Sequence, residues 1–450
     1  DHHLDRSNYH SYYRNEYKNS KTKTFVEDEL VSADKVPFEP NKISARNQQR
    51  VSSGTVMSKY RIAIAANGEY TTFHGGTVEG ALSAIVTSLN RVTGIYENEV
   101  AVTFELVADN DQIIYTSAST DPYSDGNELP ENQANLDDIL GFDNYDIGHV
   151  FTTASGGLAG LGVVCGSRKA QGTTGTNNPI GDPFDVDYVA HEIGHQFGGN
   201  HTFNGSSGNC SGGNRSGNTA YEPGSGTTIM AYANICSPQN IQSSSDPYFH
   251  VASLEQIVAF TTENGGSGCA STTETANTPP EVTITTTSTT IPANTPFQLI
   301  GEGTDEDGDE LTYSWEQYDL GPTGHPNSPE ENAAIFRVFS PVDHGMRTFP
   351  QTSDLVNGTQ TMGEILPSYT RSLNFQLVVR DNNAAGGGIN TADLSLEVDE
   401  DAGPFVVTSQ SESDLSYFSG TIQDVKWDVA GTNSGAVACE SVRILLSLDG

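Results

Sequence analysis

The sequence predicts an α/β domain followed by all-β, Ig-like sandwich modules, and three observations lead to this prediction. Apolar segments with strand spacing and helix spacing alternate over residues 58–270. A Thr/Pro-rich stretch at 271–278 then interrupts the pattern, and beyond it apolar and polar residues alternate with a period of two. The 450 residues are also enough for about three domains of ordinary size.

Within the α/β domain, strands and helices are expected in turn along the chain. The expected strands are 60–66, 100–107, 145–153 and a Gly-rich, irregular edge strand at 157–165. The expected helices are 77–97, 181–198 and 251–266. Thr77 is the expected N-cap of the first helix and Asp182 that of the second, where Pro183 would be the first helical residue.

Other segments of the chain read as separate units. Residues 1–57 are interpreted as a propeptide remnant or linker, or alternatively as an N-terminal arm, and 271–278 as a linker. Residues 279–400 are expected to form a β-sandwich, and 403–450 the start of a further β domain. The sequence begins without Met and stops directly after a strand-like segment, so we expect both termini to be trimmed.

The charge of the chain excludes several classes of function. The net charge is −37, and residues 1–57 contribute +1 of it while the remaining 393 contribute −38. Such an acidic body repels nucleic acid and anionic membranes. No run of about 20 apolar residues exists, so no membrane span is predicted. The acidity suits a secreted protein in salty or calcium-containing water, or simply maintains solubility.

The five cysteines indicate an oxidising compartment. None belongs to a CxxC pair, which argues against thioredoxin-like and zinc-ribbon sites. Four of them fall within residues 165–269, which predicts two local disulfides, although other pairings or free thiols stay open. Cys439 is left over, and its partner is expected beyond Gly450.

The segment HEIGHQFGGNH (191–201) predicts a zinc site. His191 and His195 are four residues apart on a helix, so their imidazoles project from one face. Gly198 and Gly199 end the helix and permit a sharp bend, which lets His201 approach as a third ligand. Three imidazoles leave zinc one open position, which is typical of a catalytic site. The alternative is a solvated, histidine-rich helix end.

Glu192 directly follows the first histidine, where it can act as general base toward a zinc-activated water molecule. The pattern HExxHxxGxxH fixes five positions, and a match by chance in a chain of this length is on the order of one in ten thousand or rarer. The segment therefore predicts hydrolytic zinc chemistry.

Together with Met230 in TTIMAYAN (227–234), the motif residues of 191–201 resemble the metzincin zinc proteases. The resemblance covers roughly residues 58–270 and implies a twisted mixed sheet with the zinc at the active-site helix, and Met230 in a turn beneath the zinc. GLAGLGVVC (157–165) is similar to the edge strand of bacterial reprolysin (adamalysin-like) enzymes. That likeness implies the disulfides Cys165–Cys269 and Cys210–Cys236, and a substrate peptide laid antiparallel along 157–161.

Tyr232 departs from the reprolysin pattern. It lies two residues after Met230, an arrangement that resembles astacins, serralysins and pappalysins, in which this tyrosine sits at the metal or stabilises an oxyanion. We expect the oxyanion role for Tyr232; the alternative is a tyrosine that only packs in the turn.

The acidic segment DEDGDE (305–310) is a candidate calcium site. Asp305, Asp307, Asp309 and Glu316 fall at positions 1, 3, 5 and 12 of an EF-hand frame, but position 6 is Glu310 instead of Gly and a strand follows. The segment resembles the acidic turn of PKD- or cadherin-like sandwich modules. It binds calcium through Asp305, Asp307 and Asp309, or it is a solvated turn.

The sequence as a whole predicts a secreted, zinc-dependent endopeptidase that acts on protein or peptide substrates, with β-sandwich modules able to contact a surface or matrix. One alternative is an adhesin or matrix-binding protein with a relic zinc domain, although a relic has no reason to keep Glu192. Another is a zinc hydrolase of a non-peptide amide.

Overall fold

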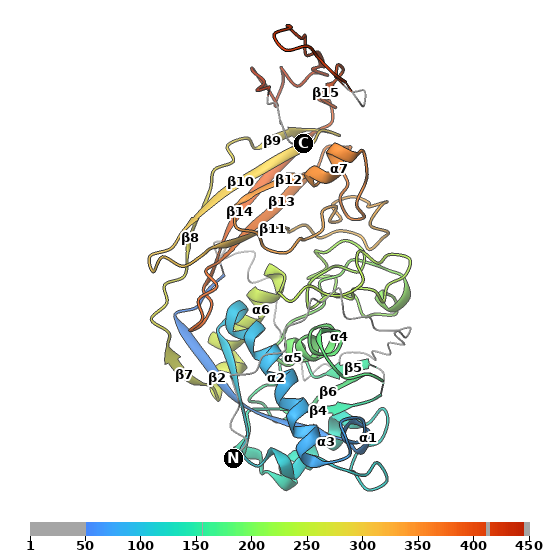
Figure 1. The fold of residues 1–450 in the computed structure, drawn as a ribbon, viewed down its shortest axis with the longest axis vertical. Coiled ribbons are helices and arrows are strands. Elements are labelled where there is room, and N and C mark those ends of the chain that lie inside the picture. The colour runs from blue at the N-terminus through green and yellow to red at the C-terminus, as the bar shows by residue number, and fades with distance from the viewer. Residues whose placement is uncertain (1–50, 155, 411–414, 445–450) are drawn as a thin grey trace.

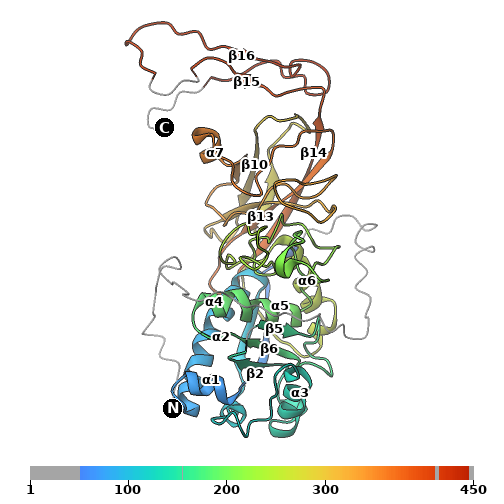
Figure 2. The same ribbon diagram turned by 90° about the vertical axis from the view of Figure 1, so that its right-hand side faces the viewer.

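The computed structural model describes residues 51–154, 156–410 and 415–444 (Figure 1). The propeptide or linker interpretation of 1–57 therefore lies, for 1–50, outside the described residues, and so does the end of the unit expected at 403–450. An α/β region occupies one end of the elongated molecule, a mainly β region lies above it, and the short ribbon β15–β16 lies beyond (Figures 1 and 2). No helix in the described ranges is long and apolar enough to cross a membrane.

The α/β region is built on a six-stranded mixed sheet with the order β3-β2-β4-β6-β5, in which β7 also pairs with β2. β2 pairs in parallel with β3 and β4, and β5 pairs antiparallel with β6 at the edge. The strands are β2 (Val56–Ala66), β3 (Val102–Leu106), β4 (Ile147–Thr152), β5 (Gly156–Ala159), β6 (Gly172–Gly175) and β7 (Ser271–Glu274). The predicted α/β fold is thus confirmed for this region.

Helices cover both faces of this sheet, because the side chains of β2 alternate between two cores. Ile62 and Ile64 pack with α2 and α6, whereas Ala63 and Ala65 pack with Leu136 of α3. The helices are α1 (Gly68–Phe73), α2 (Val78–Val100), α3 (Glu128–Ile139), α4 (Asp182–Phe184), α5 (His191–Gln196) and α6 (Val251–Thr262). As predicted, Thr77 caps α2: its side chain accepts a hydrogen bond from the backbone N–H of Gly80.

The active-site helix differs from its prediction in two ways. Its N-cap is Gly181, and Asp182 is instead the first residue of α4, where it pairs with Arg91 of α2 (Nε–Oδ1 2.9 Å). Residues Asp185–Ala190, between α4 and α5, form a π-helical segment. Such a bulge changes the angular spacing of side chains along the helix, and it directly precedes His191.

Several further boundaries differ from the sequence predictions; the edge strand expected at 157–165 is only Gly156–Ala159, and the helix expected at 251–266 ends at Thr262. The helix expected at 77–97 continues to Val100, and its C-cap Ala101 has a left-handed backbone (φ 49°). β3 therefore begins at Val102 and not at 100. The segment expected as a linker contributes β7, which pairs antiparallel with residues 56–59 of β2. Threonines favour strands, and the exposed side of β2 offers the pairing partner.

The β region contains two sheets that enclose a second core of Trp315, Phe336, Phe349, Phe375 and their neighbours. One sheet has the order β1-β14-β13-β11 with β9 beside β14, and the other the order β12-β10-β8. The strands are β1 (Ser52–Ser53), β8 (Glu281–Ile284), β9 (Thr290–Pro292), β10 (Phe297–Thr304), β11 (Thr312–Gln317), β12 (Met346–Phe349), β13 (Ser372–Arg380) and β14 (Ile389–Asp399); α7 (Thr352–Asn357) lies between β12 and β13. Beyond them, β15 (Val406–Val407) pairs with β16 (Trp427–Asp428).

The two regions share a buried, charged contact. Arg380 of β13 forms an ion pair with Glu99 of α2 (Nε–Oε1 2.7 Å), and both side chains are at most 6% exposed. Glu99 Oε2 also accepts a hydrogen bond from the backbone N–H of Phe249, and Glu316 of β11 accepts one from Val251 N at the start of α6. Breaking a buried pair of this kind leaves an uncompensated charge, so the contact fixes how the regions sit together.

Candidate metal centre

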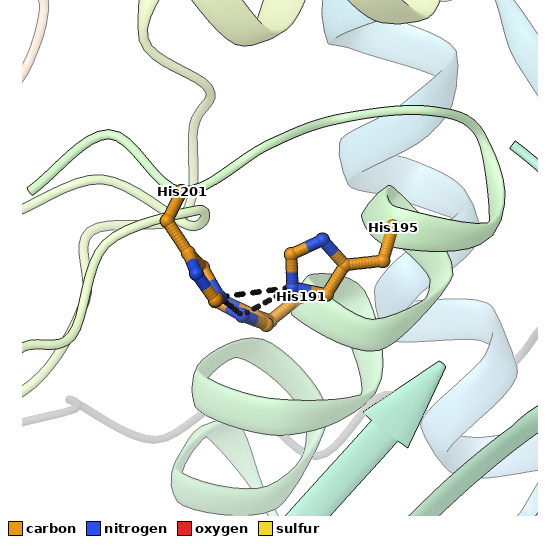
Figure 3. A group of neighbouring side chains, drawn as sticks. All are labelled: His191, His195 and His201. Carbon is orange, nitrogen blue, oxygen red and sulfur yellow. Dashed lines mark hydrogen bonds between the residues drawn. The ribbon is translucent and has the colours of Figure 1, made fainter. Parts of the chain in front are cut away.

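Three histidines meet at one point beside α5. His191 and His195 project from α5, and the chain then turns back through Gly198, whose φ of 88° is left-handed, to bring in His201. The Nε2 atoms of the three rings lie 3.0–3.2 Å from one another (Figure 3). Zinc ligands at about 2.0–2.1 Å in a tetrahedron lie roughly 3.3 Å apart, so the three nitrogens fit a zinc ion.

Each ring is held by its other nitrogen. Nδ1 of His191 lies 2.7 Å from the carbonyl of Ile229, Nδ1 of His195 lies 2.6 Å from that of Gly199, and Nδ1 of His201 lies 2.6 Å from that of Asn214. A carbonyl only accepts hydrogen bonds, so each Nδ1 must be the protonated nitrogen and each Nε2 offers a lone pair to the centre. This tautomer follows from the hydrogen-bond network.

Glu192 lies between α5 and the edge strand β5, with its side chain fully buried. A Cβ placed on Gly157 would approach the Oε1 atom of Glu192 to 2.1 Å, so any side chain at this position would displace the carboxylate. Burial and, second, the Glu192 charge raise the pKa of Tyr96, whose hydroxyl donates to the carbonyl of Ala190. The carboxylate is therefore confined beside the edge strand.

Met230 packs directly against α5 at Gly194. It is fully buried, and its sulfur would be 2.4 Å from a Cβ added to Gly194 of α5. Its carbonyl accepts a hydrogen bond from the backbone N–H of Thr202 (3.1 Å), which follows the third histidine. Gly194 thus permits the turn to pack directly against the helix, a requirement that sequence reasoning missed.

Tyr232 packs against the site from the side of His201. Their ring centroids are 4.5 Å apart, the ring of Phe203 stacks on Tyr232 at 4.4 Å, and only 2% of Tyr232 is exposed. A pocket opens beside His191 and Tyr232, and its other lining residues are Asp187, Tyr188, Ala231, Ala233, Ile235 and Ser245.

Two disulfides brace this region. Cys165, in the loop after β5, is bonded to Cys269 after α6, and Cys210 is bonded to Cys236 after the methionine turn. These are the two pairs that the resemblance implies. Cys439 has no disulfide partner among the described residues and is exposed.

His149 of β4 stays apart from the metal centre and supports α5. Its Nδ1 lies 2.9 Å from Oε1 of Gln196 and its Nε2 lies 2.8 Å from the hydroxyl of Thr174. Burial lowers its pKa to about 4, so the ring is neutral at pH 7. These contacts give His149 a structural role.

A second group that can bind a cation lies in the β region, and its membership corrects the sequence prediction. One carboxylate oxygen each of Asp305, Asp309 and Asp381 lies within 4.8 Å of the others. Asp307 is exposed and accepts from the backbone N–H of Thr278 instead, and Glu316 faces α6. Asp381 follows β13, far along the chain, so no local motif could include it.

Comparison with known proteins agrees with this geometry. Residues 56–259 match the model for the reprolysin-like metallopeptidases of family M12B. The chain has no significant match among curated protein sequences. The matched segment contains the three convergent histidines and the buried Glu192. Residues 56–259 are therefore a reprolysin-like metallopeptidase domain of family M12B, and the protein is a zinc endopeptidase.

Proposed function

We propose that the chain is a secreted endopeptidase in which Glu192 is the general base and Tyr232 an oxyanion donor. The observation that carries the proposal is the Glu192 carboxylate, which directly follows His191 in the chain and is fully buried against Gly157 of the edge strand β5. Zinc at this centre supplies a Lewis acid that acidifies water and polarises a carbonyl group. The two disulfides support an oxidising, extracellular compartment.

The chain's own residues account for the remaining steps. A substrate peptide pairs antiparallel with β5, whose outer edge is not paired to another strand of the described sheet. This places the scissile carbonyl beside Glu192, which accepts a proton from the attacking water and passes it to the leaving amine. The phenol of Tyr232 donates a hydrogen bond to the oxygen on which negative charge develops.

Replacing Glu192 by Gln tests the role of the base. General acid–base groups contribute about 10²- to 10⁴-fold to rate, so casein cleavage by full-length, zinc-loaded Glu192→Gln is expected to fall by this amount. Zinc affinity, measured by competition with a chelator, should not change, because the three ligands are intact. Glu105→Gln, on an exposed side chain of β3, is the matched control.

Two outcomes would contradict this assignment: wild-type rates for Glu192→Gln, or cleavage that survives removal of zinc by a chelator. A wild-type chain that binds zinc but cleaves neither casein nor a peptide library would favour the alternatives, an adhesin with a relic zinc domain or a hydrolase of a non-peptide amide.

Replacing Tyr232 by Phe tests the oxyanion role, because it removes only the hydroxyl. Loss of one oxyanion donor costs about 10²- to 10³-fold in kcat. We expect kcat to fall by this order while KM stays within about twofold, since the ring contacts with Phe203 remain. Tyr60→Phe, which removes a buried hydroxyl outside the site, is the control. Unchanged kcat in Tyr232→Phe would reduce Tyr232 to a packing residue.

For the rest of the chain, we propose a protease domain over 58–270 and an Ig-like, PKD- or cadherin-type sandwich over 279–400 that binds Ca²⁺ and contacts a surface or matrix. The unit starting at 403 is proposed as a further β domain and 1–57 as a propeptide remnant. Two facing sheets around one aromatic core support the sandwich. Asp305 Oδ2 is buried without a hydrogen-bond partner, and burial and, as a minor cause, Asp305 raise the pKa of Asp381.

Calcium titration of the full chain tests the cation site. Binding heat is expected for the wild type and for Asp307→Asn, whose side chain lies outside the group, and is expected to be lost in Asp381→Asn. Equal heats for wild type and Asp381→Asn would place calcium elsewhere, and absence of heat in the wild type would leave a solvated acidic turn.

A further inference from the structure

The loop between the third histidine and the methionine turn folds around one buried carboxylate that the proposed mechanism does not use. Glu222 is 1% exposed. Its Oε1 accepts hydrogen bonds from the hydroxyls of Thr202 (2.6 Å) and Thr228 (2.5 Å). Its Oε2 accepts from the hydroxyl of Thr227 (3.1 Å) and from the backbone N–H groups of Thr227 (2.7 Å) and Thr228 (3.2 Å). Five donors on one carboxylate make it the centre of this loop.

The donors lie in two segments of the zinc site: one contains His201, and the backbone of the other orients the ring of His191. Thr202 directly follows His201 in the chain. Thr228 directly precedes Ile229, whose carbonyl fixes the ring of His191 through Nδ1. One carboxylate therefore ties the backbone of the third ligand to the backbone that orients the first ligand.

The local backbone is shaped to admit this carboxylate. Glu222 N–H donates to the carbonyl of Thr202 and its own carbonyl accepts from Asn204 N–H, both at 2.8 Å. Gly226 has φ 64°, and a Cβ there would lie 3.0 Å from the side chain of Glu222 and 2.6 Å from Ala231. The backbone bonds hold Glu222 beside Thr202, and the carboxylate extends the connection to Thr227 and Thr228, next to the backbone bond from Thr202 N–H to the Met230 carbonyl.

We propose that Glu222 is a positioning residue of the zinc site. It touches neither the metal nor the substrate, and it sets the separation between His201 and the carbonyl of Ile229, so that the three Nε2 atoms converge. This inference rests on the zinc chemistry proposed above. Groups that orient metal ligands in this way typically change metal affinity by about 10- to 100-fold when removed.

The test measures zinc dissociation constants of full-length variants by competition with a chromophoric chelator, without reference to activity. Glu222→Ala removes all five acceptor contacts and is expected to bind zinc about 10- to 100-fold more weakly. Glu222→Gln is expected to stay within about threefold of the wild type, because its amide oxygen can accept from the two backbone N–H groups and its NH₂ can donate to rotated threonine hydroxyls.

A matched control separates positioning from general stability. Glu364 is also a buried carboxylate, 2% exposed, but it accepts from Arg347 and from the backbone N–H of Gln351 in the β region. Glu364→Ala is expected to lower the midpoint of thermal unfolding as Glu222→Ala does, while its zinc dissociation constant stays at the wild-type value. Thr228→Val keeps the shape of its site and removes one donor; it should weaken zinc binding several-fold even if Glu222→Ala does not fold.

The proposal would be overturned if Glu222→Ala bound zinc with wild-type affinity. If Glu222→Ala does not fold, wild-type zinc affinity in Thr228→Val would overturn it. Zinc binding weakened equally in Glu364→Ala would also overturn it. Failure of the proposed function gives a different result, since the wild-type chain would then bind zinc without cleaving peptides, or would not bind zinc.

Discussion

The site depends on one constraint: each of the three imidazoles must have its Nδ1 held by an acceptor so that its Nε2 faces a common point, and here all three acceptors are backbone carbonyls. The helix α5 supplies two rings, but only one of the three carbonyls, that of Gly199, lies next to it in sequence. The other two belong to Ile229 and Asn214, in the loop that follows. The zinc site is therefore a property of a helix together with a long, Gly/Ser-rich loop that has little regular structure of its own.

Such a loop needs support, because ordering each of its residues costs about 1–2 kcal/mol of conformational free energy. The carboxylate of Glu222 and the Cys210–Cys236 disulfide connect it internally. The β region connects it from outside. Arg215, next to Asn214, donates to the carbonyl of Gly321 (2.9 Å), and the hydroxyl of Thr323 donates to the carbonyl of Asn204 (2.9 Å). The β region thus also holds the loop that carries the carbonyl of Asn214.

Much of this site could be predicted from the sequence, because its main signals are local. Histidines four apart on a helix, glycines at the bend and one methionine in a turn motif each act within a few residues. The missed features are those that depend on distant contacts. Glu222 is a single acid in a loop without periodicity, and Asp381 joins Asp305 only through the sheet. Gly157 and Gly194 are glycines whose necessity becomes visible only when Glu192 and Met230 are packed against them.

The fold shows the same division. The periodicity of apolar residues predicts α2 and β2 correctly. The threonines predicted as a linker instead form β7, because β2 offers an open edge for pairing.

The most direct test of the metal centre is X-ray absorption spectroscopy of zinc in the full-length protein. Three imidazole nitrogens at about 2.0–2.1 Å and one further oxygen or nitrogen ligand are expected. A spectrum with sulfur ligands, or with fewer than three imidazoles, would contradict the assignment of His191, His195 and His201 as the metal centre.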